Sequence, residues 1–421
     1  MPKKQLTDAL ALDESPQDAP TLAGWQATGL ALAAAAMAAR AGLGALIGAV
    51  LVAPIVYALV RLRRHAPEAR STSGLVGSTL GPRGAAFAGV LQVTGYAVIA
   101  VTAAQTFGLV WTPIDVTDDL DGAVQVNPWL WSTWAVAAIV VAAVLVFALP
   151  GRIVASLAGV LGLGGLLIQF YYGLAVIARQ ASGTASQLTV GNDPPTGLAV
   201  AGILATLAVT TAGFEVVTAR TRRGSTGGWP MSLAIAFVAV VAAVAWWACQ
   251  HSAYGAGSLN AGDFGLAVND FYGDTGTKIV TLGSAMFVFA ALLALLWGVG
   301  AVTDRLDVTA PSDAVFAGIV VTMVVLAVAV IQLGWTLGYV GALVLFALYA
   351  VIVVANSKVP AESVVTWWLR LVMPVALAAV VVLPLLWAEF SLHALAPVLV
   401  AAVLIAAAAV TALLGTRSRP D

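Results

Sequence analysis

Long apolar stretches separated by short polar segments follow one another along almost the whole chain. A helix of about 20 residues, rising 1.5 Å per residue, crosses a hydrocarbon core of roughly 30 Å. Turn residues and charges divide the apolar sequence into segments of about this length. We therefore predict twelve membrane-spanning helices, at residues 22–39, 43–61, 85–112, 130–149, 153–178, 198–219, 231–250, 277–302, 313–333, 336–356, 367–387 and 393–414.

The distribution of positive charges supports this count. Cytosolic loops of membrane proteins carry an excess of lysine and arginine. If the N-terminus is cytosolic, all but three of the 19 lysines and arginines fall on the cytosolic side, the exceptions being Arg40, Arg179 and Lys278. One missed helix would invert every later loop and destroy this bias. We therefore predict that both termini are cytosolic.

The composition agrees with a multi-pass protein of the plasma membrane. The chain is 61% hydrophobic and 9% charged, with a mean hydropathy of +0.98, far from the values of soluble domains. Residues 1–20 are polar and lack an apolar core, so we interpret them as a disordered cytosolic tail and not as a signal peptide. The abundance of Arg, Ala and Val is typical of a GC-rich bacterial genome, and we expect a bacterial inner membrane.

Several function classes find no support in the sequence. The single cysteine, Cys249, and three scattered histidines give no metal-ligand spacing. No phosphate-binding loop motif occurs, and every predicted loop is too short for a nucleotide-binding domain. The net charge of −1 gives no reason to expect a nucleic-acid partner. We expect no metal or cofactor, and any transport work must be driven by gradients.

The stretch 202–224 contains the main candidate site. Its apolar helix is interrupted at 210–213, carries Glu215 at membrane depth, and is followed by a cluster of arginines beginning at Arg220. An ionisable residue inside a membrane helix marks a functional site by default. If the helix starts near residue 198, the interruption lies roughly 18 Å into it, close to the middle of the membrane.

Two groups of motifs resemble the amino acid-polyamine-organocation superfamily of secondary transporters. The family's sixth helix carries a small-residue break, then Gly-Phe-Glu and a basic loop, which is similar to Gly213-Phe214-Glu215 and the arginines that follow. Its second and third helices are connected by a signature that resembles, in order, Val56-Tyr57-Ala58-Leu59, Pro67-Glu68-Ala69, Leu80-Gly81-Pro82 and Gly89.

The resemblance implies an all-α fold with two inverted repeats of five helices. The repeats correspond to about 21–180 and 195–357 within a core of 21–357, and two extra helices with a short tail occupy 358–421. The first and sixth helices are expected to be broken at the midplane. The family's glycine-containing break in the first helix is replaced here by the alanine-rich stretch 32–37. Because alanine is the best helix former, this stretch favours a continuous helix, and a small-residue packing face is an equally good interpretation.

A broken helix offers unpaired N–H and C=O groups that bind a carboxylate and an amine without buried side-chain charges. We predict that the substrate site consists of Thr210, Thr211, Ala212, Gly213, Phe214, Ala35, Gln92, Tyr96 and Trp297. For several of these residues, helix packing explains the sequence as well. Glu215 is expected to act as a gate, to carry a coupled proton, or simply to form an interfacial pair with Arg220 or Arg152.

These observations predict a twelve-helix secondary transporter of an amino acid or related small amine, working by alternating access in a lipid bilayer. The oligomeric state is left open. A membrane-embedded enzyme is the first alternative, but Glu215 is nearly alone among the helices, and catalysis would need several convergent polar groups. The second alternative is a non-transporting sensor or scaffold that keeps the fold, which the missing glycines of the first helix leave open.

Overall fold

A computed structural model describes residues 22–69, 71–112, 114–116, 124–181, 211–220, 228–250, 264–304, 311–335, 337–360, 378 and 392–415. The predicted tail at 1–20, the first part of the sixth predicted helix and nearly all of the eleventh lie outside these ranges. Nine helices of the described ranges are long and apolar enough to cross a membrane. The protein is thus a multi-pass membrane protein.

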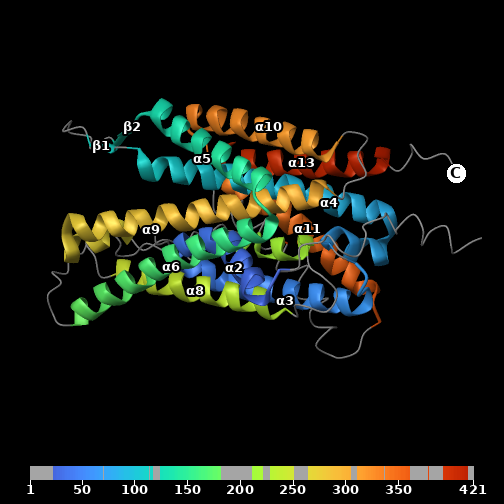
Figure 1. Ribbon diagram of the computed structural model, residues 1–421, viewed down its shortest axis with the longest axis horizontal. Helices are drawn as coiled ribbons and strands as arrows, with labels where there is room; N and C mark the ends of the chain where they lie inside the picture. Colours follow the sequence, from blue (N-terminus) through green and yellow to red (C-terminus); the bar gives the residue numbers. More distant parts are fainter. Residues whose placement is uncertain are drawn as a thin grey trace, which may run out of the picture.

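The long helices run roughly parallel to one another in a bundle, with a small β-hairpin at one end (Figure 1). The hairpin pairs β1 (Ile114–Val116) with β2 (Val124–Val126) in antiparallel register. The helical elements are α2 (Gly24–Ala35), η1 (Ala36–Ala41), α3 (Leu43–His65), α4 (Thr72–Trp111), α5 (Pro128–Ala148), α6 (Gly151–Ala181), η3 (Phe214–Arg220), α8 (Trp229–Cys249), α9 (Phe264–Thr303), α10 (Ser312–Gln332), α11 (Gly338–Lys358) and α13 (Leu392–Gly415).

Most of the helix bounds agree with the predicted spans to within a few residues, but α4 and α9 begin 13 residues earlier than predicted. Both have 40 residues, and both contain a glycine with positive φ at their tenth position, Gly81 at 77° and Gly273 at 63°. Residues with a Cβ rarely adopt such angles. Each of these helices therefore consists of a short segment, a glycine joint and a spanning segment, a feature that the hydropathy pattern alone did not reveal.

Glycines bring α6 close to two neighbouring helices. A Cβ placed on Gly159 would lie 3.0 Å from the Cα of Gly29 in α2, and one on Gly165 would lie 2.3 Å from the carbonyl oxygen of Gly283 in α9. Lipid tails are as apolar as the helices themselves, so helix association in a membrane depends on close packing at small residues. These glycines therefore position α2 and α9 against α6.

Arg61 fixes the end of α11. Its side chain is only 5% exposed, and it donates hydrogen bonds to the Asn356 side-chain oxygen at 3.3 Å and the Val359 carbonyl at 3.2 Å, as well as to the Pro360 carbonyl. Val359 and Pro360 follow directly after the last residue of α11. A buried guanidinium from α3 therefore holds the C-terminal end of α11 and the segment that leaves it, and links these two helices.

The close crossing of α2 and α6 predicts a specific sensitivity. We expect Gly159→Ala to lower the free energy of unfolding by about 1–3 kcal/mol, because the added methyl group meets backbone atoms that cannot move independently. Gly318→Ala in α10 is the matched control, since a Cβ there meets nothing within 4 Å and stability should be unchanged or slightly higher. Thermal unfolding of the purified variants in detergent measures both, and equal midpoints would contradict the packing argument.

Candidate functional site

Of the sixth predicted helix the structure describes residues 211–219, and the backbone there departs from an α-helix at Gly213, where the sequence predicts the break. Gly213 has φ of 109°, and a 3₁₀ helix, η3, begins directly after it. A Cβ at this position would lie 3.4 Å from the Leu295 side chain and 3.6 Å from the Ala34 carbonyl oxygen. Both the backbone conformation and the close neighbours therefore favour glycine. The break lies directly against α2 and α9.

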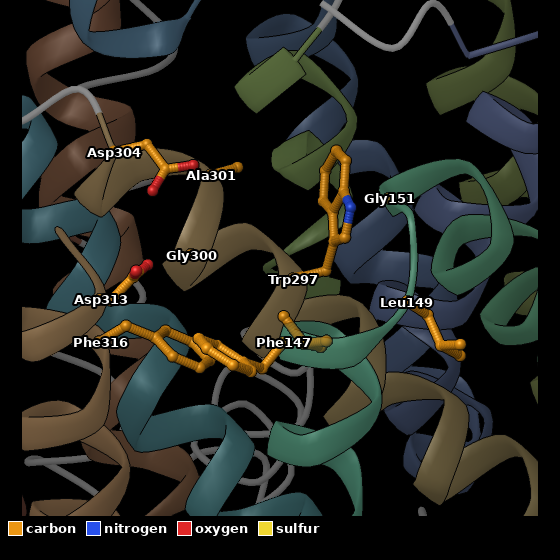
Figure 2. A pocket seen from close by; sticks show the side chains of 10 residues that line it. Phe147, Leu149, Gly151, Trp297, Gly300, Ala301, Asp304, Asp313 and Phe316 are labelled. Atoms are coloured by element: carbon orange, nitrogen blue, oxygen red, sulfur yellow. The ribbon is translucent and has the colours of Figure 1, made fainter.

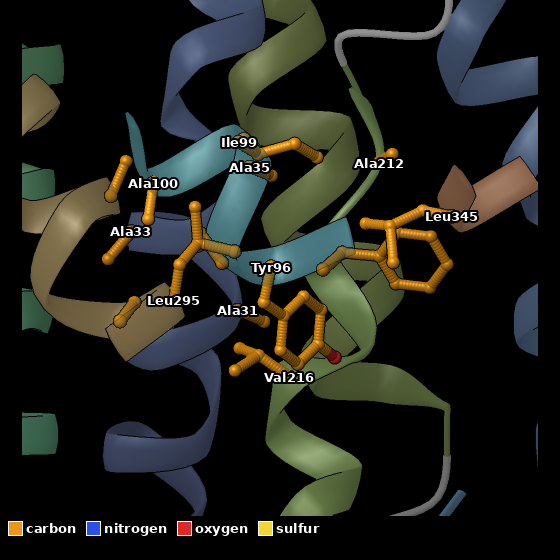
Figure 3. Packing of buried hydrophobic residues seen from close by; sticks show 14 of the residues in the cluster. Ala31, Ala33, Ala35, Tyr96, Ile99, Ala100, Ala212, Val216, Leu295 and Leu345 are labelled. Carbon is orange, nitrogen blue, oxygen red and sulfur yellow. The ribbon is translucent and has the colours of Figure 1, made fainter. Parts of the chain in front are cut away.

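The first helix also changes conformation at its alanine-rich stretch. The α-helix ends at Ala35, continues as the 3₁₀ helix η1, and stops at Gly42 with φ of 56°. Alanine propensity favours a continuous α-helix, so the tertiary structure overrides the local preference here. Figure 3 shows Ala35 with Ala212 and Tyr96 in one packed cluster of buried residues. The two predicted halves of the site thus lie together.

Glu215 lies at the centre of a buried hydrogen-bond network. Its carboxylate oxygen Oε2 accepts a hydrogen bond from the Tyr349 hydroxyl at 2.5 Å and from the Gly213 backbone N–H at 3.2 Å. The same N–H also donates to the Tyr349 hydroxyl oxygen at 3.1 Å. The other carboxylate oxygen, Oε1, is buried and has no hydrogen-bond partner among the residues that the structure describes. The backbone N–H of Gly213, at the break, therefore donates one hydrogen bond to the carboxylate, and the Tyr349 hydroxyl of α11 donates the other.

Two polar residues of α4 complete the cluster. The Gln92 amide nitrogen donates to the Tyr96 hydroxyl at 2.8 Å, and Tyr96 also faces the Glu215 carboxyl group. Both α4 side chains are fully buried, and the Gln92 oxygen Oε1 has no partner in the described part of the chain. A buried acceptor without a donor costs about 1–3 kcal/mol. The cluster therefore contains two acceptors, one on Glu215 and one on Gln92, that are ready to receive hydrogen bonds.

Trp297 lies apart from this cluster. It lines a cavity of about 370 Å³ between α5, α9 and α10, together with Asp304, Asp313 and Phe316 (Figure 2). The next residue, Gly298, faces the cluster instead, because a Cβ there would lie 2.9 Å from the Tyr96 ring. Helices α9 and α4 thus meet at the cluster through Gly298, whereas the predicted site residue Trp297 lines the neighbouring cavity and does not join the other predicted residues.

The other predicted residues surround the break. Thr211, Ala212 and Phe214 are buried, and the Phe214 ring lies 5.7 Å from that of Tyr349, while Thr210 lies outside the described residues.

The predicted arginine partners of Glu215 lie elsewhere or are only partly described. The carbonyl of Arg152, at the start of α6, accepts hydrogen bonds from Gln26 and Ser156. Arg220 ends η3, and its side chain lies outside the described part. Within the described residues, Glu215 is held by a tyrosine and a backbone N–H. The sequence reasoning missed Tyr349, although a tyrosine in the middle of an apolar helix is itself a signal.

Comparison with known proteins identifies the architecture. Scans with family models and a search of curated proteins found no match to the sequence. Among solved structures, the crystal structure of MhsT in complex with L-phenylalanine matches with a TM-score of 0.55 and 15% sequence identity, covering 86% of this chain and 98% of that one. This protein has the leucine-transporter-like fold. The predicted fold class is therefore confirmed, and η3 and the Glu215 cluster lie among α2, α4, α9 and α11 of this fold.

The geometry around Glu215 predicts that Tyr349→Phe destabilises the protein. The change removes a donor to a buried carboxylate and an acceptor for the Gly213 N–H, so we expect a loss of about 1–3 kcal/mol in the free energy of unfolding. Tyr171→Phe is the control, because the Tyr171 ring is 66% exposed. Thermal unfolding in detergent provides the measurement. If the two variants melt at the same temperature, the Tyr349 hydroxyl does not support the break.

Proposed function

We propose that this protein is a secondary transporter that moves an amino acid or a related small amine across a bacterial inner membrane by alternating access. The single observation that carries the proposal is the buried polar cluster at a broken helix within a leucine-transporter-like fold. The described structure and the sequence also support a multi-pass arrangement, which we propose has both termini in the cytosol.

The unpaired acceptors support an amine as one end of the substrate. An ammonium group has three donors and no acceptor, which complements the free oxygens of Glu215 and Gln92. The substrate would lie against the small residues Ala35, Ala212 and Gly213, whose size leaves room for it once the helices separate. The complex of MhsT with L-phenylalanine, a protein of the same fold, also supports an amino acid.

The hydrogen bonds of Glu215 support a gate. They join the second half of the sixth helix to α11 through Tyr349, while Tyr96 of α4 faces the same carboxyl group. Access to the break requires these elements to separate, and exchanging a few hydrogen bonds for contacts with substrate or water costs little net free energy. We therefore assign to Glu215, Tyr96 and Tyr349 the closing of the site on one side.

The inverted repeats expected at about 21–180 and 195–357 find support in the pair α4 and α9. These are the third and eighth predicted spans, so they occupy the same place in the two repeats. Both carry a glycine joint at the tenth of 40 residues. Alternating access in folds built from inverted repeats is largely a rocking of one part against the other around a central site. The two joints are matched positions for such a movement.

A sensor or scaffold that keeps the fold is the second candidate. The observation that favours it is the tight packing of the expected site, where Ala35 and Ala212 are each only 1% exposed and Tyr96 is fully buried. A sensor would bind its ligand and show no flux.

Reconstitution into proteoliposomes tests the proposal. We expect uptake of at least one member of a panel of amino acids and amines under an imposed proton or sodium gradient, and a raised unfolding midpoint of the purified protein with the same compound. Binding without uptake would favour the sensor, and silence in both assays across the panel would contradict both candidates.

The role of Glu215 is tested in the same vesicles with Glu215→Gln. A gate should lose gradient-driven accumulation and exchange of preloaded substrate to the same degree, since both need the site to close. If exchange persists while accumulation driven by a pH gradient is abolished, Glu215 carries a transported proton and the gate assignment is wrong. Glu68→Gln, at an exposed turn, is the control and should retain both activities.

A further inference from the structure

The first segment of α4 is a separate short helix, Thr72–Leu80, that ends at the Gly81 joint. Ser71 caps it, because the Ser71 hydroxyl oxygen accepts a hydrogen bond from the Gly74 N–H at 3.0 Å. The predicted spans placed this segment in the loop between the second and third helices. In the structure, Leu75 and Val76 are fully buried within the protein. The short helix is therefore docked against the bundle.

Its first residue, Thr72, touches the second half of the sixth helix. The hydroxyl groups of Thr72 and Thr218 lie 2.5 Å apart, and both side chains are buried. The Thr218 hydroxyl donates its hydrogen to the Glu215 carbonyl oxygen at 2.6 Å. The hydrogen between the two threonines must therefore come from Thr72, because each hydroxyl has only one. Thr72 thus binds η3 within one turn of the Glu215 carboxylate.

Thr72 is also joined to α4 beyond the glycine joint. The Gln92 amide nitrogen has two hydrogens, and it lies 2.8 Å from the Tyr96 hydroxyl and 3.4 Å from the Thr72 hydroxyl. One amide therefore contacts both the residue that faces Glu215 and the first residue of the short helix. The four side chains linked in this way, those of Thr218, Thr72, Gln92 and Tyr96, are all buried. A displacement of η3 leaves the Thr72 hydroxyl without its Thr218 partner unless the short helix moves as well.

We propose that Thr72 is a positioning residue that locks the short helix Thr72–Leu80 to η3, so that opening of the Glu215 gate and displacement of this helix occur together. The proposal rests on the gate assigned above. Gly81 supplies the joint, since its backbone has φ of 77° and a Cβ there would meet nothing within 4 Å. Residues at such joints absorb changes in backbone angle during domain movements. In this proposal the short helix is docked while the Glu215 gate is closed and is displaced from the bundle when the gate opens.

Thiol labelling tests this coupling without any substrate, so its outcome does not depend on finding the transported compound. Cys249 is the only cysteine, and Cys249→Ala gives a background in which a single Val76→Cys reports displacement of the short helix. Thr72→Val removes the hydroxyl at nearly constant volume. We expect it to raise the labelling rate at position 76 by about three- to tenfold in detergent, the size of a lost hydrogen bond between membrane helices. Thr72→Ser should restore the parent rate.

Two controls separate the lock from general loosening. Thr79→Val removes a hydroxyl of the same helix that, among the described residues, bonds only the Val76 carbonyl, and it should leave the rate unchanged. A cysteine in place of Ala142, fully buried in α5, should not label faster in the Thr72→Val variant. If it does, the hydroxyl supports folding in general and the proposed lock is wrong.

The link to the gate is tested by a double-mutant cycle. Tyr349→Phe weakens the gate, and we expect it to speed labelling at position 76 when Thr72 is present and to have no further effect when Thr72 is valine. If the effect of Tyr349→Phe is the same in both backgrounds, the short helix and the gate move independently and the proposal fails. Thr218→Val, with Thr218→Ser as its rescue, applies the same test from η3 and decides the question if the Thr72 variant does not fold.

Discussion

A carboxylate buried away from water is the constraint on which the centre of this protein depends. Glu215 keeps its place because Gly213 breaks the sixth helix and turns a backbone N–H toward it, and because Tyr349 adds a hydroxyl from α11. The position of Tyr349 in turn depends on α11, whose C-terminal end is bound by the buried guanidinium of Arg61 through the Asn356 side chain and the Val359 carbonyl. A buried polar group without a hydrogen-bond partner destabilises the folded protein. Loss of any one of these contacts therefore leaves another buried polar group unpaired.

Close packing at small residues sets the frame around this carboxylate. Lipid offers no hydrophobic force between helices, so contacts such as Gly159 on Gly29 and Gly165 on Gly283 bring α2 and α9 against α6. In the proposed function, a second set of small residues, Ala35, Ala212 and Gly213, leaves room beside the break for a ligand when the helices part. The glycine joints of α4 and α9 are each the tenth of 40 residues. Each joint connects a short first segment, which has its own contacts with the bundle, to a long spanning segment.

Much of the fold can be predicted from the sequence, because the positions of the helices depend on the lengths of the apolar runs and the break depends on the local preference of one glycine. Apolar runs long enough to cross a membrane gave helix positions that agree with the structure within a few residues for most spans. The break at Gly213 was also readable, since glycine favours the positive φ found there. The first helix was not readable in this way. Its alanines favour an α-helix, yet η1 is a 3₁₀ helix, because contacts with the neighbouring helices outweigh a small local propensity.

The sequence by itself determined that the chain spans a membrane many times, and it singled out Glu215 as a candidate site residue, since a long apolar helix can hold a carboxylate only at a cost. Only the tertiary structure decided which groups meet it. Tyr349 is 134 residues from Glu215 and Thr72 is 146 residues from Thr218, so no local pattern relates them. Hydrogen bonds are short-ranged and directional, and these pairs form only after helix packing has fixed the distances between their elements.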